Sequence, residues 1–183
     1  MEGHAPPQYT VRSLDDYLEH LSKPVFQAGI SWRVVEAKWP GIKKAFHDFK
    51  VERVARMTDR EIDTVAKDER VIRSRPKIAA VVHNANALLE LEREGGFKKH
   101  LRAFDDYEPL ATDLKKRFKF IGDSGVYHFL WSVKQPVPEW HDWAKAHGML
   151  PGGDGKGRGS RSLPRGARGS SRTTTRRSAR SRT

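Results

Sequence analysis

The fold of this chain is indicated most clearly by residues 75–89, RPKIAAVVHNANALL. Apolar residues recur in this stretch at intervals of three and four, which places them on one face of an α-helix. They are Ile78, Val81, Val82, Ala85, Leu88 and Leu89. We therefore expect a long and well-buried helix that begins near Arg75.

Helical spacing also dominates the chain from about residue 13 to residue 147. We expect helices over residues 15–21, 26–39, 109–117 and 124–133, with breaks at Pro24, Pro40-Gly41, Gly95-Gly96 and Gly122. Thr58 followed by Glu61 fits a capping box, which would start one more helix. Because no alternating strand pattern is found, the chain is predicted to be all-α, with about six to nine short helices.

Composition divides the 183 residues into three parts. We expect a flexible leader over residues 1–12, a helical domain over 13–148 and a disordered tail over 149–183, which has too few large apolar residues to offset the entropy of ordering. Lys and Arg exceed Asp and Glu by 12, and the tail carries most of this excess. An Arg-rich tail would bind nucleic-acid phosphates without reading sequence, and a solubilising extension is an equal alternative.

The chain has no cysteine. This excludes disulfides, a thiolate nucleophile, iron–sulfur clusters and zinc sites with Cys ligands. A signal peptide and an apolar run of about 18–20 residues are both lacking, so we expect a soluble cytoplasmic protein that does not bind a membrane. We further expect a monomer that uses no cofactor.

Residues 27–32, Gln-Ala-Gly-Ile-Ser-Trp, are the first candidate for chemistry. Ala28 and Gly29 allow a ligand or another chain to come close, Gln27 offers an amide, and Trp32 offers a flat face for stacking. These are the elements of a nucleobase pocket. The structural alternative, which composition alone favours, is tight helix packing around a core tryptophan.

The second candidate is a basic stretch that ends in a glycine-containing turn. Gly122 precedes a helix that begins at Asp123 or Ser124, and the free N–H groups of a helix N-terminus suit a phosphate oxygen. The basic residues beside this turn are Lys115, Lys116, Arg117 and Lys119. Their structural alternative is a solvated charged face.

Three collinear blocks together resemble the 3-methyladenine DNA glycosylase I family. The blocks are residues 27–32, residues 72–78 with Asn84 and Ala85, and residues 114–122 with Tyr127 and Phe129. The resemblance covers roughly residues 14–135. It implies a helix-hairpin-helix fold and an enzyme of base excision repair, which flips a damaged purine out of the duplex and hydrolyses its N-glycosidic bond.

The resemblance also implies roles for particular residues. Trp32 would stack on the extruded base, Gln27 and Ser31 would line its pocket, and Gly122 and Ser124 would bind a phosphate through the hairpin. A 3-alkylated adenine is cationic and a good leaving group, so the pocket needs only to select it and admit water. The implied partner is double-stranded DNA containing alkylated bases, and the expected backbone contacts are Arg73, Arg75, Lys77, Lys115, Lys116, Arg117 and Lys119.

The chain departs from the family pattern in four places. The Cys and His residues that hold a structural zinc in the family are absent as a set, and His4, His141 and His147 are interpreted as surface residues, so no metal site is expected. Pro24 replaces a glutamate that hydrogen-bonds the damaged base, and a proline has neither a carboxylate nor an N–H. Arg70 replaces a glycine of the second block, and the leader lacks the family's aromatic and His stretch.

Glu139 is a candidate catalytic residue, because residues 135–141 loosely resemble the segment where other branches of the superfamily carry a catalytic aspartate. It would stabilise an oxocarbenium-like sugar or activate water, whereas the favoured alternative is that it caps a helix over residues 139–147. For the whole chain, the alternatives are a catalytically inactive helix-hairpin-helix DNA-binding protein and a small helical adaptor with a basic tail.

Overall fold

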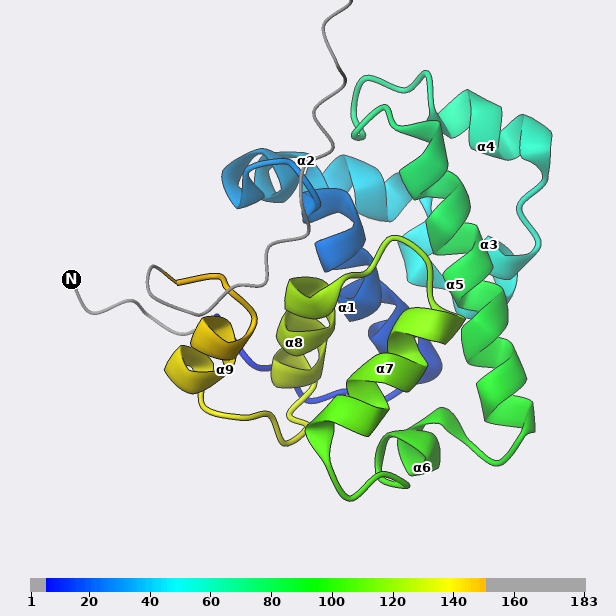
Figure 1. The fold of residues 1–183 in the computed structure, drawn as a ribbon. Coiled ribbons are helices and arrows are strands. Elements are labelled where there is room, and N and C mark those ends of the chain that lie inside the picture. Colours follow the sequence, from blue (N-terminus) through cyan, green and yellow to red (C-terminus); the bar gives the residue numbers. More distant parts are fainter. Residues whose placement is uncertain (1–5, 151–183) are drawn as a thin grey trace, which may run out of the picture.

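The computed structural model describes residues 6–150, which form a bundle of α-helices without a strand (Figure 1). The all-α prediction is therefore confirmed for this part of the chain. A 3₁₀ turn at His47–Phe49 joins the second and third helices. The helices are α1 (Leu14–Gln27), α2 (Trp32–Ala45), α3 (Val51–Ala55), α4 (Asp59–Val65), α5 (Arg75–Arg93), α6 (Phe97–Leu101), α7 (Tyr107–Arg117), α8 (Asp123–Ser132) and α9 (Trp140–Ala146).

Local sequence signals account for several helix ends. The helix α5 begins at Arg75, as the apolar periodicity predicts, with a proline in its first turn, where the missing N–H costs nothing. At α4, the Thr58 side chain accepts from the Glu61 N–H and the Glu61 carboxylate accepts from the Thr58 N–H, which confirms the capping box. Breaks at Gly95-Gly96 and at Gly122 are also found where they are expected.

The expected breaks at Pro24 and Pro40 are wrong, because each proline lies inside a helix. A proline leaves one carbonyl of the preceding turn without its helical hydrogen bond. Packing offsets this cost at Pro24, where Val25 and Phe26 are both fully buried. The chain turns instead at Gly29, whose φ of +72° lies in the left-handed region that favours glycine. The second helix consequently runs from residue 32 to 45 and not from 26 to 39.

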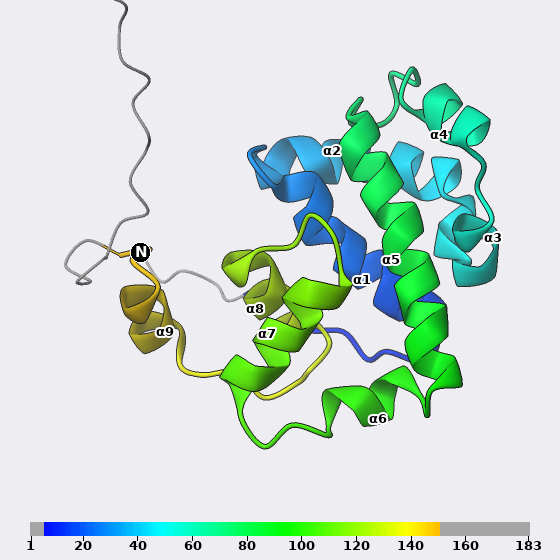
Figure 2. The same ribbon diagram turned by 45° about the vertical axis from the view of Figure 1, so that its right-hand side comes forward.

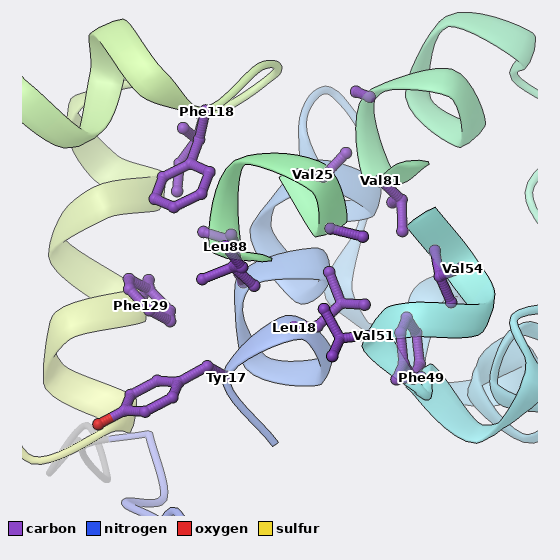
Figure 3. Close-up of a cluster of buried hydrophobic side chains, with 14 of the residues drawn as sticks. Tyr17, Leu18, Val25, Phe49, Val51, Val54, Val81, Leu88, Phe118 and Phe129 are labelled. Carbon is purple, nitrogen blue, oxygen red and sulfur yellow. The ribbon is translucent and has the colours of Figure 1, made fainter. Parts of the chain in front are cut away.

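One continuous core holds the bundle together, and α1 lies inside it (Figure 3). This helix contacts α2, α5 and α8. Leu18 and Val25 of α1 are fully buried, together with Val81 and Leu88 of α5 and Phe129 of α8. The apolar stripe predicted on α5 therefore faces the core, and α1 connects the half of the molecule that contains α3 and α4 to the half that contains α7 and α8.

The segment before α1, residues 6–12, lies along α8 and is hydrogen-bonded to it, although the sequence predicts a flexible leader there. The Tyr9 N–H donates to the Ser132 carbonyl at 2.7 Å, and the Trp131 indole donates to the Pro6 carbonyl at 2.8 Å. The expected tail lies outside the described residues, apart from residues 149 and 150. In the part of the chain that is described, no helix is both long enough and apolar enough to cross a bilayer.

The last helix, α9, lies at the edge of the molecule opposite α3 and α4 (Figure 2). It attaches through aromatic rings. Trp143 is buried and lies 4.5 Å from Tyr127 of α8 and 6.4 Å from Tyr107 of α7, measured between ring centroids. A small aromatic cluster, separate from the main core, therefore holds the C-terminal helix against α7 and α8.

Candidate functional site

A cavity of about 320 Å³ opens between α1, α2, α8 and the segment before α1. Its volume lies at the lower end of the range of small-molecule sites, which is ~300–1,000 Å³. Apolar and aromatic groups provide most of its wall. The lining residues are Pro6, Pro7, Tyr9, Lys23, Pro24, Gln27, Trp32, Glu36, His128 and Ser132.

Two of the three expected base-binding residues lie at this cavity. Gln27 is the last residue of α1 and Trp32 is the first of α2, so the tight turn at Gly29 brings both to one wall. Trp32 is 38% exposed, which excludes the alternative of a core tryptophan. Ser31 is the N-cap residue of α2 and is absent from the lining, so its expected place in the pocket wall is corrected.

Sequence reasoning missed Tyr9 and Lys23, which form another part of the wall with His20 behind them. The Tyr9 ring stacks on the His20 ring with 4.3 Å between centroids, and the Lys23 ammonium lies 4.4 Å from the Tyr9 centroid. His20 is only 8% exposed, and burial lowers the pKa of its imidazole to about 4, so it is neutral near pH 7. Burial also lowers the pKa of Lys23. No spacing within the sequence links Tyr9 to α1, so only the fold reveals this contact.

His128 of α8 also lines the cavity. Burial lowers the pKa of this imidazole as well, and its ring lies 5.5 Å from that of Trp140 in the aromatic cluster around α9. The C-terminal helix therefore supports the cavity wall through ring contacts.

The hairpin between α7 and α8 is held by a buried amide that was not expected to have a role. Asn84 of α5 is 1% exposed, and its Oδ1 accepts from the Lys119 N–H at 2.8 Å while its Nδ2 donates to the Lys119 carbonyl at 3.1 Å. The neighbouring His83 imidazole bonds to the Arg117 carbonyl at 3.1 Å. Phe120 at the tip has a φ of +58° and is 47% exposed, so this clamp holds a turn that the local backbone disfavours.

Gly122 and Ser124 lie where the hairpin enters α8. Gly122 is the N-cap residue, and the first N–H groups of a helix have no intrahelical acceptor. A Cβ placed on Gly122 would meet no atom within 4 Å, so the turn is open to an approaching group. This arrangement suits an anion, because backbone donors and the positive end of the helix dipole point outward.

Gly125 connects the hairpin to the cavity. A Cβ at this position would lie 2.9 Å from Ile121 and 3.2 Å from Pro24, so a larger residue would crowd both the hairpin and α1. Since Pro24 lines the cavity, the helix that begins at the open turn also packs against the cavity wall.

Lys77 is corrected as a candidate contact to the DNA backbone. It is 6% exposed, and its ammonium donates to the carbonyls of Phe26, at 3.0 Å, and Ala28. These carbonyls belong to the end of α1 and the turn that follows it. Lys77 therefore satisfies the C-terminal carbonyls of α1 and positions the turn before Trp32.

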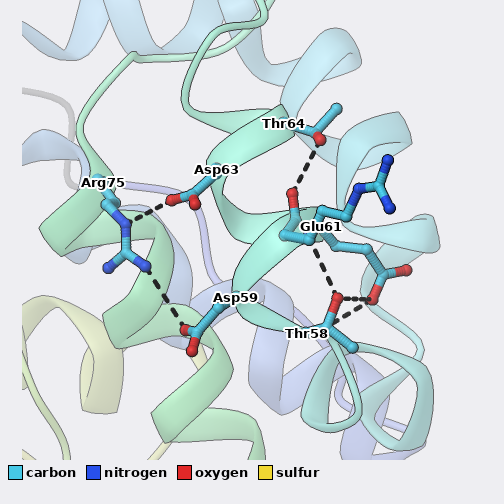
Figure 4. A network of polar contacts seen from close by, with 7 residues as sticks. Thr58, Asp59, Glu61, Asp63, Thr64 and Arg75 are labelled. Atoms are coloured by element: carbon cyan, nitrogen blue, oxygen red, sulfur yellow. Dashed lines mark hydrogen bonds and ion pairs between the residues drawn. The ribbon is translucent and has the colours of Figure 1, made fainter.

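The other expected backbone contacts differ in how freely they can bind a phosphate. Arg75 pairs with Asp63 at 2.6 Å and with Asp59 at 3.5 Å, which joins α5 to α4 (Figure 4). Arg117 pairs with Asp113 at 3.0 Å. Three of the expected backbone contacts are exposed and make no ion pair with any residue of the described range, namely Arg73, Lys116 and Lys119.

Lys115 pairs with Asp123 beside the open turn. Both side chains are partly exposed, and a surface pair of this kind contributes little to stability. Its ammonium is therefore near the turn but shared with a carboxylate.

Glu139 caps α9, which favours the capping interpretation and corrects the catalytic one. Its carboxylate accepts from the Asp142 N–H at 2.9 Å, and this and a second backbone hydrogen bond lower the pKa of the carboxyl. Glu139 is also absent from the residues that line the cavity.

The described residues do not fit the zinc that the family resemblance implies. Between residues 6 and 150, no group of three or more His, Asp or Glu side chains is placed to hold a metal ion. Cysteine ligands are excluded throughout the chain by composition.

Comparison with known proteins identifies the family. The family model described as methyladenine glycosylase matches residues 9–116. The DNA-3-methyladenine glycosylase of Haemophilus influenzae is 33% identical over 129 residues, which cover 58% of this chain and 70% of that protein. DNA-3-methyladenine glycosylase 1 of Escherichia coli is 32% identical over 126 residues, which cover 57% of this chain and 67% of that protein.

Solved structures agree with this result. A crystal structure of 3-methyladenine DNA glycosylase I has a TM-score of 0.60 at 27% identity and covers 68% of this chain and 80% of its own. The Staphylococcus aureus enzyme has a TM-score of 0.61 at 26% identity, and the match covers 68% of this chain and 78% of that enzyme. Sequence and fold therefore lead to the same conclusion, that the chain belongs to the methyladenine glycosylase family.

Proposed function

We propose that this chain is a DNA N-glycosylase of base excision repair, which flips alkylated purines of the 3-methyladenine type out of double-stranded DNA and hydrolyses their N-glycosidic bond. The Haemophilus influenzae and Escherichia coli relatives are named for this activity. A point variant of one solved relative was determined in complex with 3-methyladenine. The proposal extends to this chain the substrate class of those relatives.

The observation that carries the proposal is the open cavity at Trp32. An extruded base needs a flat face to stack on, a hydrogen-bonding group and an apolar enclosure. Trp32 supplies an exposed indole, Gln27 an amide, and the remaining wall is largely apolar. A chain that retained only the fold would be expected to fill this space with side chains.

The roles follow from these positions. Trp32 stacks on the base and Gln27 hydrogen-bonds its edge. Gly122 and Ser124 hold a phosphate through the open turn before α8, and exposed cations nearby bind the backbone without reading sequence. The enzyme acts as a monomer on DNA in the cytoplasm. Because a base alkylated at N3 is already a good leaving group, selection of the base and admission of water suffice for hydrolysis.

Release of free base from alkylated DNA tests the proposal. Purified protein is incubated with duplex DNA that has been treated with methyl methanesulfonate, and released bases are separated by chromatography. We expect 3-methyladenine to be released in a protein-dependent manner, and none from untreated DNA. Absence of release at any protein concentration would overturn the proposal.

A second candidate function, lesion-independent DNA binding without catalysis, is favoured by Pro24. This residue lines the cavity at the position where the family resemblance implies a glutamate, and it cannot hydrogen-bond a base through a side chain or an N–H. Under this alternative, the protein binds methylated and unmethylated duplexes with equal affinity and releases no base. The same assay, combined with a binding titration, distinguishes the two functions.

A further inference from the structure

Glu36 is the one acidic residue that lines the cavity in the described part of the chain. It follows Trp32 by four positions on α2, and residues at this spacing lie one above the other on the same helix face. Glu36 is exposed, so its carboxylate can be reached from solvent. The cavity that Trp32 lines therefore also has a carboxylate in its wall.

The Glu36 carboxylate has no polar partner within the described residues. It makes no hydrogen bond or ion pair with any residue from 6 to 150. The nearby Glu19 differs in this respect, because it accepts from the Trp39 indole at 3.2 Å and pairs with Lys43 at 3.4 Å. Glu36 therefore does not stabilise the fold through a hydrogen bond or an ion pair within the described range.

Lys23 brings the opposite charge to the same cavity. Its ammonium faces the Tyr9 ring and makes no hydrogen bond to another described residue. A cation in the cavity repels a cationic base, whereas a carboxylate attracts it, and both effects grow where apolar walls exclude water. The charge that the cavity prefers in a ligand is therefore a balance between these two residues.

We propose that the Glu36 carboxylate selects positively charged bases in this cavity and stabilises the positive charge that passes to the sugar as the glycosidic bond breaks. The inference rests on the proposed glycosylase function. In the reaction, the electron pair of the C1′–N bond leaves with the base, which becomes neutral, and the sugar becomes oxocarbenium-like. Water then adds to C1′ and loses one proton to solvent. Glu36 faces a cation before and during bond cleavage, and it needs to exchange no proton.

The test separates charge selection from catalysis by using two abasic-site analogues. One duplex carries a pyrrolidine, which is protonated and cationic, and the other carries the neutral tetrahydrofuran of the same shape. Dissociation constants for both duplexes are measured for the parent, Glu36→Gln and Lys23→Gln. Glu52→Gln, an exposed glutamate on α3 that makes no hydrogen bond within the described range, is the matched control. Release of 3-methyladenine is measured in parallel, and circular dichroism checks that each variant is folded.

We expect Glu36→Gln to reduce the preference for the cationic duplex, and the rate of release, by up to about fivefold, as for loss of a solvent-exposed charge partner. Lys23→Gln should shift the preference in the opposite direction, which a purely structural effect would not do. The control should match the parent.

An unchanged preference in Glu36→Gln overturns the inference, whether or not the parent releases bases. If Glu36→Gln does not fold, an unchanged preference in Lys23→Gln overturns it instead. If Glu36→Gln shifts the preference but the parent releases no base, only the proposed function is overturned.

Discussion

The hairpin before α8 and the cavity beside α8 share one helix, but they are built over very different sequence distances. The hairpin is a nearly continuous piece of chain, with Asn84 as its main distant support. The cavity joins the segment before α1, both ends of the turn at Gly29, and two residues of α8. The turn proposed to bind phosphate is therefore encoded locally, whereas the cavity proposed to select a base depends on the packing of distant segments.

The largest expected effect is a loss of folding stability at acidic pH, caused by His20 behind the cavity wall. In the folded chain burial lowers the pKa of His20 to about 4 from 6.5, so the unfolded chain binds more protons between these values. The free energy of unfolding is therefore not reduced by His20 above pH 6.5. It falls as the pH is lowered from 6.5 toward 4, by about 3 kcal/mol in total. Urea denaturation across this range should show a flatter pH dependence for His20→Gln than for the parent.

The exposed His141→Gln variant is the control for this prediction, since it removes an imidazole outside the cavity. If the parent and His20→Gln curves run parallel between pH 4 and 6.5, the buried imidazole does not titrate as the structure indicates.

Loss of the stacking surface should come next in size. Trp32→Ala removes the indole from the cavity, and stacking of a base on an aromatic side chain contributes ~1–3 kcal/mol. We expect release of 3-methyladenine to fall by about 10- to 100-fold. Affinity for undamaged duplex should hardly change, because the hairpin is intact. Val34→Ala, an exposed neighbour on α2, should behave like the parent. A parallel loss of duplex affinity in Trp32→Ala would contradict the division between the two regions.

The hairpin can be loosened without touching the cavity by Asn84→Ala. This change leaves the Lys119 N–H and carbonyl without their partner, and each buried hydrogen bond of this kind contributes ~1 kcal/mol. We expect duplex affinity to fall about tenfold, with KM raised more than kcat is lowered. Asn86→Ala is a matched control on the same helix, because Asn86 bonds to Ala55 and Val82 instead. Equal loss of duplex affinity in both variants would mean that the clamp acts only through general stability.

The smallest effect is expected at Glu139, outside both regions. Glu139→Ala removes the cap of α9, so Tm should fall slightly, while the rate of base release should stay at the parent level. Thermal denaturation and the release assay measure the two quantities on the same sample. A large loss of release with unchanged Tm would restore the catalytic interpretation of this residue.

Short-range patterns predicted a large part of this molecule. The stripe on α5, the capping box at Thr58 and the glycine turn before α8 depend on spacings within a few residues, and each is found as expected. The differences between the predicted and the observed structure come from long-range packing. Burial of Val25 and Phe26 lets α1 continue through Pro24, and the ordered place of Tyr9 depends on α8, which follows more than a hundred residues later.

The same division holds for the candidate site. The residue types in 27–32 and in the hairpin were compatible with a nucleobase pocket and a phosphate turn, because stacking and N-terminal helix donors are local chemical properties. Composition alone favoured a core tryptophan, and the functional interpretation came from the family resemblance. Only the tertiary structure decided that Lys77 is buried beneath α1 and that Lys23 and Glu36 line one cavity, whereas the cap of α9 by Glu139 was already the favoured interpretation of the sequence. A charged side chain has the same chemistry in any sequence context, and its neighbours in the folded chain determine whether it supports a helix or meets a ligand.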